Sequence, residues 1–259
     1  MIELEGATRT YGAKVAVDAL RLTIPPGELF AFLGPNGAGK TTTIKMLVGL
    51  LRPSGGSIRV CGLDVVSQAR EASLQIGYVP DQPYLYEKLT GREFLRFIAD
   101  MYGLDARVAK ERVEHEIRRF ELEDFADYLA ESYSHGMKQR TVFASALLHD
   151  PAVLIVDEPM VGLDPHGAQL LKQSIRDYAK LGMTILLSTH SLNVAEEISD
   201  RIAIIDHGKI LTIGTMEQLR ERVGGYQGSL EQIFLQLTAT TVNTERERKD
   251  SPTEVGLDG

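Results

Sequence analysis

Residues 34–42, with the sequence GPNGAGKTT, constrain the local structure of this chain more than any other segment. Their spacing is G-x-x-x-x-G-K-T, whose glycines let the backbone approach a polyphosphate closely without Cβ clashes. Residues 28–33 before them read as a buried strand, and residues 42–51 have the apolar spacing of a helix. Such a loop presents backbone amides to an anion at a helix N-terminus. We therefore predict a nucleotide-binding loop made of Gly34, Pro35, Asn36, Gly37, Ala38, Gly39, Lys40, Thr41 and Thr42.

Two side chains of this loop have separate expected tasks. Lys40 would reach the β- and γ-phosphates, and the hydroxyl of Thr41 would coordinate Mg²⁺. The alternative, a glycine-rich turn without a ligand, does not account for the strand and helix that flank the loop. The loop alone does not choose among GTPases, kinases, recombinases and transport ATPases. A GTPase would also need a guanine-reading sequence of the NKxD type, which this chain lacks.

Composition narrows the class of protein and its surroundings. The 259 residues are enough for one large α/β unit or for a main domain with a subdomain. A single cysteine, Cys61, excludes an internal disulfide framework and a thiolate zinc site. The net charge of -8 argues against duplex nucleic acid as the main partner. No apolar run approaches the roughly 18 residues that span a bilayer, and no export signal begins the chain, so we expect a soluble protein.

The order of elements predicts an α/β fold with a parallel sheet. Antiparallel strands are expected within residues 2–24, and a helical insertion from residue 90 to about residue 125. Strand and helix patterns then alternate in residues 153–156, 169–181, 184–187, 192–198 and 202–205. This alternation predicts helices on both faces of a parallel sheet, with ligands at the carboxyl ends of its strands. The polar residues 240–259 are expected to form a disordered tail.

Two consecutive carboxylates end a buried strand at residues 152–156. Placing Asp157 and Glu158 there is costly unless a cation lies at the strand tip, and a magnesium nucleotide would supply it. We predict that Asp157 partners Mg²⁺, either directly or through another ligand of the metal, and that Glu158 orients and deprotonates the attacking water. The alternative is a solvated strand end that carries two acids.

One histidine is expected at the same edge of the sheet. His190 follows the strand pattern at residues 183–187, so it would emerge beside Asp157. A lone histidine there is more often a hydrogen-bonded structural residue. Together with the loop and the two carboxylates, we favour a contact from His190 to the γ-phosphate or to its water.

These residues resemble the nucleotide-binding subunit of an ATP-binding cassette (ABC) transporter, from residue 1 to about residue 239. Residues 133–140, YSHGMKQR, occupy the place of that family's signature sequence, and we call them the signature segment. Asp164 lies in a GLD sequence that resembles the loop crossing the dimer interface. His190 resembles the switch histidine, and Tyr11 resembles the aromatic residue that stacks on adenine. The alternative for Tyr11 is ordinary packing at a strand edge.

The resemblance implies a fold and an assembly. The fold is a P-loop NTPase (RecA-like) parallel-sheet core with an N-terminal antiparallel β-subdomain and an α-helical subdomain inserted at about residues 84–135. Two cassettes would meet head to tail, with ATP between the phosphate loop of one and the signature of the other. The chain itself does not choose between a homodimer and a heterodimer. The residues expected to act in trans are Ser134, His135, Gly136 and Met137.

The resemblance also implies a task and a place in the cell. The chain would hydrolyse ATP to drive a separate integral membrane permease, as a peripheral protein on the cytoplasmic face of the inner or plasma membrane. No nucleic-acid partner is expected. The alternative is a soluble cassette that acts as a mechanical switch on nucleic acid or ribosomes. Such proteins usually carry two cassettes or a long coiled coil, whereas this chain has one phosphate loop and no sustained heptads.

Two positions depart from the usual family pattern. The signature reads YSHGM instead of LSGGQ, so His135 replaces a glycine and Met137 replaces a glutamine. Forms of the YSxGM type are similar to those of cassettes that serve ABC-2 type exporters, as is the closing sequence at residues 228–238. In the family, a glutamine in the loop after residue 79 couples the nucleotide to the membrane partner. Aligning this chain with the family pattern without gaps puts Asp81 at the position of that glutamine and Gln82 one residue later. We therefore predict export and assign Asp81 and Gln82 to the coupling loop.

Overall fold

The N-terminal part of the chain forms an antiparallel sheet. The computed structural model describes residues 1–222 and 230–235. Strands β1 (Ile2–Tyr11) and β2 (Lys14–Ile24) form a long hairpin. β4 (Gly55–Val60) pairs with the other edge of β1, and the short β5 (Leu63–Asp64) completes the order β2-β1-β4-β5. The predicted antiparallel strands of this region are therefore present, and they form a sheet of their own.

A second sheet forms the centre of the molecule. Its strands are β3 (Leu29–Leu33), β6 (Ile76–Val79), β7 (Val153–Asp157), β8 (Thr184–Thr189), β9 (Arg201–Asp206) and β10 (Lys209–Gly214). They lie in the order β10-β9-β3-β8-β7-β6, and all neighbouring pairs are parallel except β9 with β10. The carboxyl ends of β3, β6, β7 and β8 therefore meet at one edge of this sheet, as the sequence predicts.

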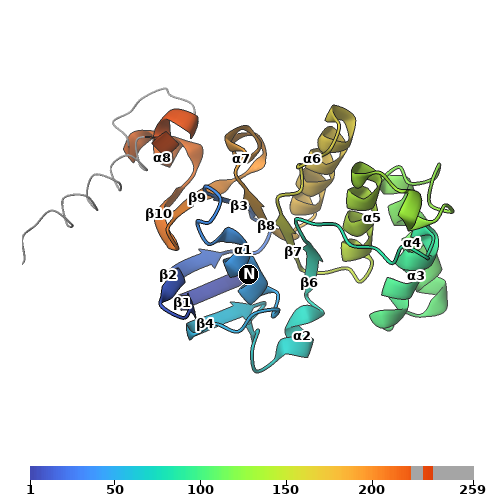
Figure 1. Cartoon of the computed structure of the whole chain (residues 1–259), viewed down its shortest axis with the longest axis horizontal. Helices are drawn as coiled ribbons and strands as arrows, with labels where there is room; N and C mark the ends of the chain where they lie inside the picture. The colour runs from blue at the N-terminus through green and yellow to red at the C-terminus, as the bar shows by residue number, and fades with distance from the viewer. Residues whose placement is uncertain (223–229, 236–259) are drawn as a thin grey trace, which may run out of the picture.

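Both faces of the central sheet are covered, because its strands are apolar on both sides. In β8, Ile185 and Leu187 pack into one apolar cluster and Leu186 packs into another. Helix α1 (Lys40–Leu47) lies between the central and the antiparallel sheets (Figure 1). Helices α6 (Pro165–Lys180) and α7 (Leu192–Ile198) cover the opposite face. Alternate residues of one strand thus stabilise two layers.

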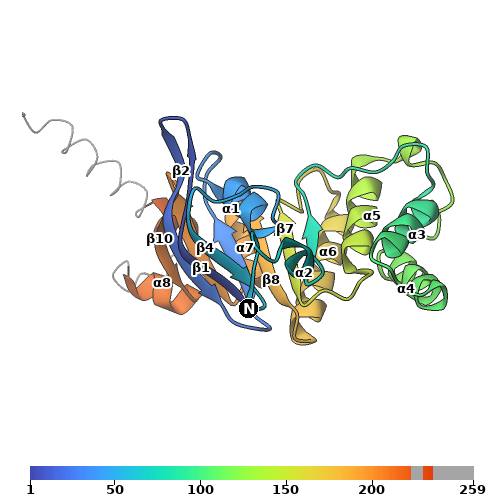
Figure 2. The same cartoon turned by 90° about the horizontal axis from the view of Figure 1, so that it is seen from below.

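A group of helices lies at the far end of the molecule from the antiparallel sheet (Figure 2). It consists of α3 (Gly91–Met101), α4 (Ala106–Arg119) and α5 (His135–Leu147), with a short 3₁₀ turn η1 (Ala130–Ser132) before α5. Thr90 begins α3 with a capping box, in which its hydroxyl accepts a hydrogen bond from the Glu93 amide. The apolar sides of these helices merge with those of α6, β7 and β8 in one core cluster. The helical region is therefore packed onto the core.

Several elements differ from the sequence expectations at their ends. Helix α1 stops at Leu47 instead of continuing to residue 51, because Gly49 takes a positive φ of 75°. Helix α6 begins four residues before the predicted start, since Asp164 caps it and Pro165 occupies its first turn. Strand β10 and helices α2 (Ala69–Ser73) and α8 (Met216–Arg222) complete the fold; β10 and α8 were not predicted.

Some sequence expectations fall where the structure describes little or nothing. The predicted tail at residues 240–259 and the predicted end of the cassette near residue 239 lie outside the described residues. The closing sequence at residues 228–238 is described only at residues 230–235, where Leu230 and Ile233 are buried. Within the described part of the chain, none of the helices has the length and hydropathy to cross a membrane.

Candidate functional site

The phosphate loop joins β3 to α1 and lies closely against two other strands. A Cβ atom added at Gly39 would lie 2.7 Å from the carbonyl oxygen of Ala16, and Gly39 has a φ of 106°. A Cβ atom at Gly34 would lie 2.3 Å from the carbonyl oxygen of Ile205. Glycine is therefore required at both ends of the loop, because any larger residue would displace it from β2 and β9.

The lysine of this loop is buried at the start of α1. Lys40 is 6% exposed, and its Nζ donates hydrogen bonds to the carbonyl oxygens of Gly34 at 2.7 Å and Pro35 at 3.2 Å. Its Nζ also lies 3.5 Å from Oε1 of Glu158. The ammonium group is thus held where the loop meets the end of β7. Among the other loop residues, Asn36 and Gly37 are exposed and Ala38 is buried.

Asp157 ends β7 in a fully buried position. Its Oδ1 accepts a hydrogen bond of 2.5 Å from the Ser188 hydroxyl, whereas its buried Oδ2 has no hydrogen-bond partner. Burial raises the pKa of Asp157; the hydroxyls of Ser188 and Thr41 lower it, and the charges of Asp81 and Glu158 raise it. An unpaired buried carboxylate oxygen beside a threonine hydroxyl fits a hard cation such as Mg²⁺, whose preferred ligands are oxygens.

Glu158 lies between the lysine and His190. Its backbone takes a positive φ of 50°, and its amide donates to the carbonyl oxygen of Ser188 at 3.0 Å. Its Oε2 lies 2.9 Å from Nδ1 of His190 and accepts a 3.3 Å hydrogen bond from the His190 amide. Such a backbone conformation is unfavourable for a glutamate, and the surrounding contacts maintain it. The structure therefore brings Lys40, Glu158 and His190 together.

Lys40 and Glu158 line a cavity of about 430 Å³, which we call the nucleotide cavity; Asp157 and His190 lie beside these two residues but do not line it. Tyr11 and Lys14, at the two ends of the β1–β2 turn, line it, and Arg9 lies over the Tyr11 ring with its Cζ 4.8 Å from the ring centroid. Asp81 lines it too, whereas Gln82 does not. The full lining is Tyr11, Lys14, Ala16, Asn36, Gly37, Gly39, Lys40, Thr41, Thr42, Asp81 and Glu158.

The signature segment lies elsewhere in the chain. Ser134 caps α5, and its hydroxyl accepts a 3.3 Å hydrogen bond from the Met137 amide. Around it lies a cavity of about 200 Å³, which we call the signature cavity; its lining is Ser134, His135, Gly136, Met137, Arg140, Gly162, Leu163, Asp164 and Gly167. It shares no lining residue with the nucleotide cavity. Asp164 caps α6 by accepting a 2.7 Å hydrogen bond from the Gly167 amide.

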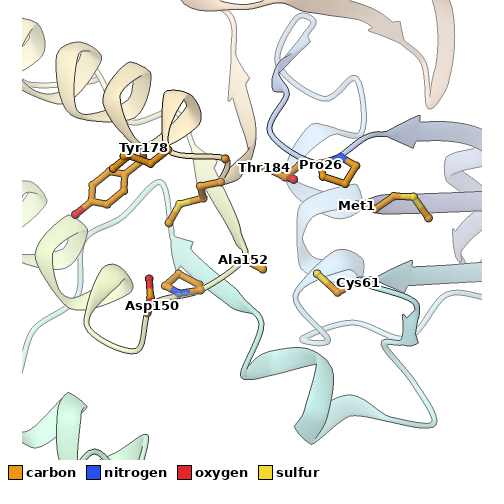
Figure 3. Close-up of a pocket in the computed structure, with 11 residues that line it drawn as sticks. Met1, Pro26, Cys61, Asp150, Ala152, Tyr178 and Thr184 are labelled. Atoms are coloured by element: carbon orange, nitrogen blue, oxygen red, sulfur yellow. The ribbon is translucent and has the colours of Figure 1, made fainter. Parts of the chain in front are cut away.

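A cavity larger than the nucleotide cavity lies at the opposite ends of the central strands. It has a volume of about 550 Å³ and lies where β7 and β8 begin, beside Ala152 and Thr184. Figure 3 shows Asp150 and Ala152 on one side of it and Met1, Pro26 and Cys61 on the other. No lysine, arginine or histidine lines it, so it offers no cationic side chain to a phosphate. The smaller nucleotide cavity has the chemistry that a nucleotide needs.

Sequence reasoning missed three contributors to these sites. Lys14 and Ala16 line the nucleotide cavity from β2, and Ser188 binds Asp157 from the neighbouring strand. Pairing of β7 with β8 puts Ser188 opposite Asp157, so this contact depends on strand order. Lys14 could have been predicted to line the cavity, because it lies three residues after Tyr11 in a hairpin whose tip reaches the phosphate loop.

Comparison with known proteins gives consistent results. The family model for ABC transporters matches residues 17–161. A daunorubicin resistance ATP-binding protein of Streptomyces coeruleorubidus is 38% identical, over 97% of this chain and 83% of that protein. A linearmycin resistance ATP-binding protein of Bacillus subtilis is 37% identical, over 94% of this chain and 76% of that protein. A Nod factor export ATP-binding protein of Burkholderia pseudomallei is 41% identical, over 85% of this chain and 72% of that protein.

Solved structures show the same likeness. The ATP-binding subunit of an ABC transporter superposes with a TM-score of 0.87 at 34% identity, over 92% of this chain and 99% of that one. A dimeric ATP-binding cassette in a post-hydrolysis state, bound to ADP and Pi, has a TM-score of 0.77 at 25% identity, over 83% of this chain and 99% of that one.

Proposed function

This chain belongs to the ABC transporter family and is an ATP-binding, ATP-hydrolysing subunit of a membrane transporter, and we propose that it drives a separate permease by ATP-dependent pairing with a second cassette. The observation that carries the proposal is the meeting of Lys40, Asp157 and Glu158 at one edge of the central sheet. The 3.5 Å distance from Lys40 Nζ to Glu158 Oε1 means that one triphosphate can contact both groups. These charged groups lie at the end of β7 and in the phosphate loop, whose glycines let its backbone pass close to the neighbouring strands.

The side chains around the nucleotide cavity divide the work of phosphoryl transfer. Loop amides and Lys40 bind and orient the phosphates, and Tyr11 offers an aromatic face to the base. Glu158 accepts the proton of the attacking water, and His190 holds the Glu158 carboxylate and senses the γ-phosphate. Thr41 and Asp157 would hold Mg²⁺, which when bound neutralises charge on the phosphates. Positioning and charge stabilisation therefore account for the chemistry.

The signature cavity explains why a second cassette is needed. Ser134 and the first amides of α5 can bind an anion, yet they line a cavity separate from the nucleotide cavity of the same chain. A second copy or a related cassette, facing the first, would place Ser134 and Gly136 over the bound γ-phosphate. Asp164 lines the signature cavity and would lie near that contact. ATP binding would close the pair, and hydrolysis would release it.

Our proposals for the membrane partner and for the direction of transport depend on the relatives that this chain resembles. The named relatives are resistance and export ATP-binding proteins. The signature of this chain has the form YSHGM, which resembles the form that we associate with cassettes of ABC-2 type exporters. We therefore place the chain on the cytoplasmic face of the membrane, bound to an integral permease in an exporter. Asp81 and Gln82 lie in the segment between β6 and α3 that would couple the nucleotide to this permease.

The Glu158→Gln variant tests the proposal. Glutamine keeps the shape of the side chain but cannot accept a proton, so we expect ATP binding to persist and turnover to fall by about a thousandfold. Size-exclusion chromatography with ATP and Mg²⁺ should then show a dimer that the wild type forms only transiently. As a control, Glu111→Gln changes an exposed glutamate on α4 and should leave the ATPase unchanged. Full turnover in Glu158→Gln would disprove the assignment of the base.

A further inference from the structure

One side chain of the signature segment contacts the loop that follows Glu158. His135 occupies the first helical position of α5, where the usual family signature has a glycine. Its Nε2 lies 3.0 Å from the carbonyl oxygen of Val161. A carbonyl can only accept a hydrogen bond, so Nε2 carries the hydrogen and donates it. The imidazole therefore connects α5 to the loop between β7 and α6.

The loop is packed closely against this ring. A Cβ atom added at Gly162 would lie 2.8 Å from Cδ2 of His135, and Gly162 takes a positive φ of 74°. Both its conformation and the space beside the ring therefore require glycine. The side chain of Leu163 approaches the next residue of α5, since its Cδ2 would lie 3.5 Å from a Cβ atom added at Gly136. The first turn of α5 and residues 161–163 thus form one packed unit.

The same loop begins at the residue that we assign as the general base. The Val161 amide donates to the carbonyl oxygen of Glu158 at 3.4 Å, and the Leu163 amide donates to that of Met160 at 3.4 Å. These long hydrogen bonds are weak, so contacts from outside the loop are needed to fix its conformation. Asp164 fixes the far end of the loop by capping α6. His135 supplies the contact in between.

We propose that His135 is a positioning residue, which holds residues 158–164 through Val161 and so keeps the Glu158 carboxylate in its productive orientation. The inference rests on the proposed function, because Glu158 matters only if it activates water. If Ser134 and Gly136 bind the γ-phosphate of a facing cassette, the His135 contact also connects that event to the Glu158 of its own chain. Each nucleotide cavity would then respond to the other through one imidazole.

Two substitutions at this position separate its hydrogen bond from its bulk. His135→Ala removes the donor, whereas His135→Gln places an amide N–H at about the position of Nε2. The matched control is His166→Ala, since His166 is an exposed histidine whose Nε2 lies 2.7 Å from Oε2 of the exposed Glu121. The readouts are kcat and KM for ATP, the melting temperature, and ATP-dependent dimerisation of each variant in the Glu158→Gln background.

We expect His135→Ala to lower kcat by about fivefold to tenfold, as the loss of one hydrogen bond predicts, while KM stays within about twofold. His135→Gln should recover at least half of the wild-type kcat, and His166→Ala should match the wild type. ATP-dependent dimerisation should persist in His135→Ala, because the α5 amides and Ser134 remain.

Three results would overturn the inference. The first is an unchanged kcat in His135→Ala, and the second is a kcat in His135→Gln that stays as low as in His135→Ala. The third is a loss of ATP-dependent dimerisation in His135→Ala as large as its loss of kcat, which would make His135 a direct phosphate contact. Failure of the proposed pairing is seen separately, as the absence of an ATP-dependent dimer in Glu158→Gln alone. In that case the kinetic comparison of His135→Ala with His135→Gln still decides the positioning role.

Discussion

The nucleotide cavity and the signature cavity are built in different ways. In the nucleotide cavity Lys40 is 6% exposed, and the neighbouring Asp157 is fully buried, whereas Lys14 and Asp81, which also line the cavity, are exposed. In the signature cavity Ser134 and His135 are exposed, and their side chains form hydrogen bonds with backbone groups of the same chain. Burial strengthens charge interactions and fixes geometry before a ligand arrives. The first cavity is therefore organised to hold a ligand, and the second, under the proposed function, would meet a ligand that a facing cassette holds.

The largest expected effect on ATP binding comes from removing the buried cation. We expect Lys40→Ala to weaken ATP binding by about a hundredfold, since two phosphates lose a desolvated charged donor. Titration with a fluorescent ATP analogue measures the change. Lys45→Ala, on the exposed side of the same helix, is the control and should bind normally. A Lys40→Ala affinity within tenfold of the wild type would contradict a buried, preorganised cavity.

A smaller effect is expected from His190, which is half exposed. Its ring and amide both contact Oε2 of Glu158, so His190→Ala should misplace this carboxylate and lower kcat by about tenfold. The dissociation constant for ATP should change less than about threefold, because the phosphate loop is intact. Steady-state kinetics and nucleotide titration separate the two quantities. Unchanged turnover would return His190 to a structural role.

The joint between the helical region and the core contains a buried acid. Glu116 on α4 is 5% exposed and accepts hydrogen bonds from the Tyr178 hydroxyl on α6 at 3.1 and 3.3 Å. Burial raises the pKa of Glu116 to about 7, although the Tyr178 hydroxyl and the charges of Arg119 and Arg112 lower it. Because the folded state holds this proton more tightly than the unfolded chain, stability decreases as the pH rises from about 4.5 to about 7.

Glu116→Gln should therefore stabilise the protein at high pH. Glutamine is neutral and its carbonyl can still accept from Tyr178, so the gain in unfolding free energy at pH 8 should be on the order of 3 kcal/mol and should vanish near pH 4.5. Urea denaturation of both proteins across this pH range measures the difference. Glu111→Gln, an exposed glutamate on the same helix, should show no such trend. An advantage that does not depend on pH would disprove the raised pKa.

The two cavities also differ in how far the sequence predicts them. The phosphate loop and the Asp157-Glu158 pair are each a continuous stretch of sequence that follows a strand. Because parallel strands end at the same edge of a sheet, these local patterns were enough to predict that the two stretches lie close together. The contact between His135 and Val161 joins residues 26 positions apart. It depends on how α5 packs beside the loop before α6, which no local pattern contains. Strand β10 was missed for a similar reason, because it pairs antiparallel at the edge of an otherwise parallel sheet.

The smallest effect is expected where the chain passes from the core to the helical region. Asp81 is exposed and lines the nucleotide cavity, and its charge raises the pKa of Asp157. Solvent screens an exposed charge, so Asp81→Gln should change the dissociation constant for ATP by less than about threefold. The matched control is Gln82→Ala, at an exposed neighbour that does not line this cavity. A loss beyond tenfold in Asp81→Gln alone would show that Asp81 binds the metal directly, and the nucleotide cavity would then extend onto the segment that leads to the helices.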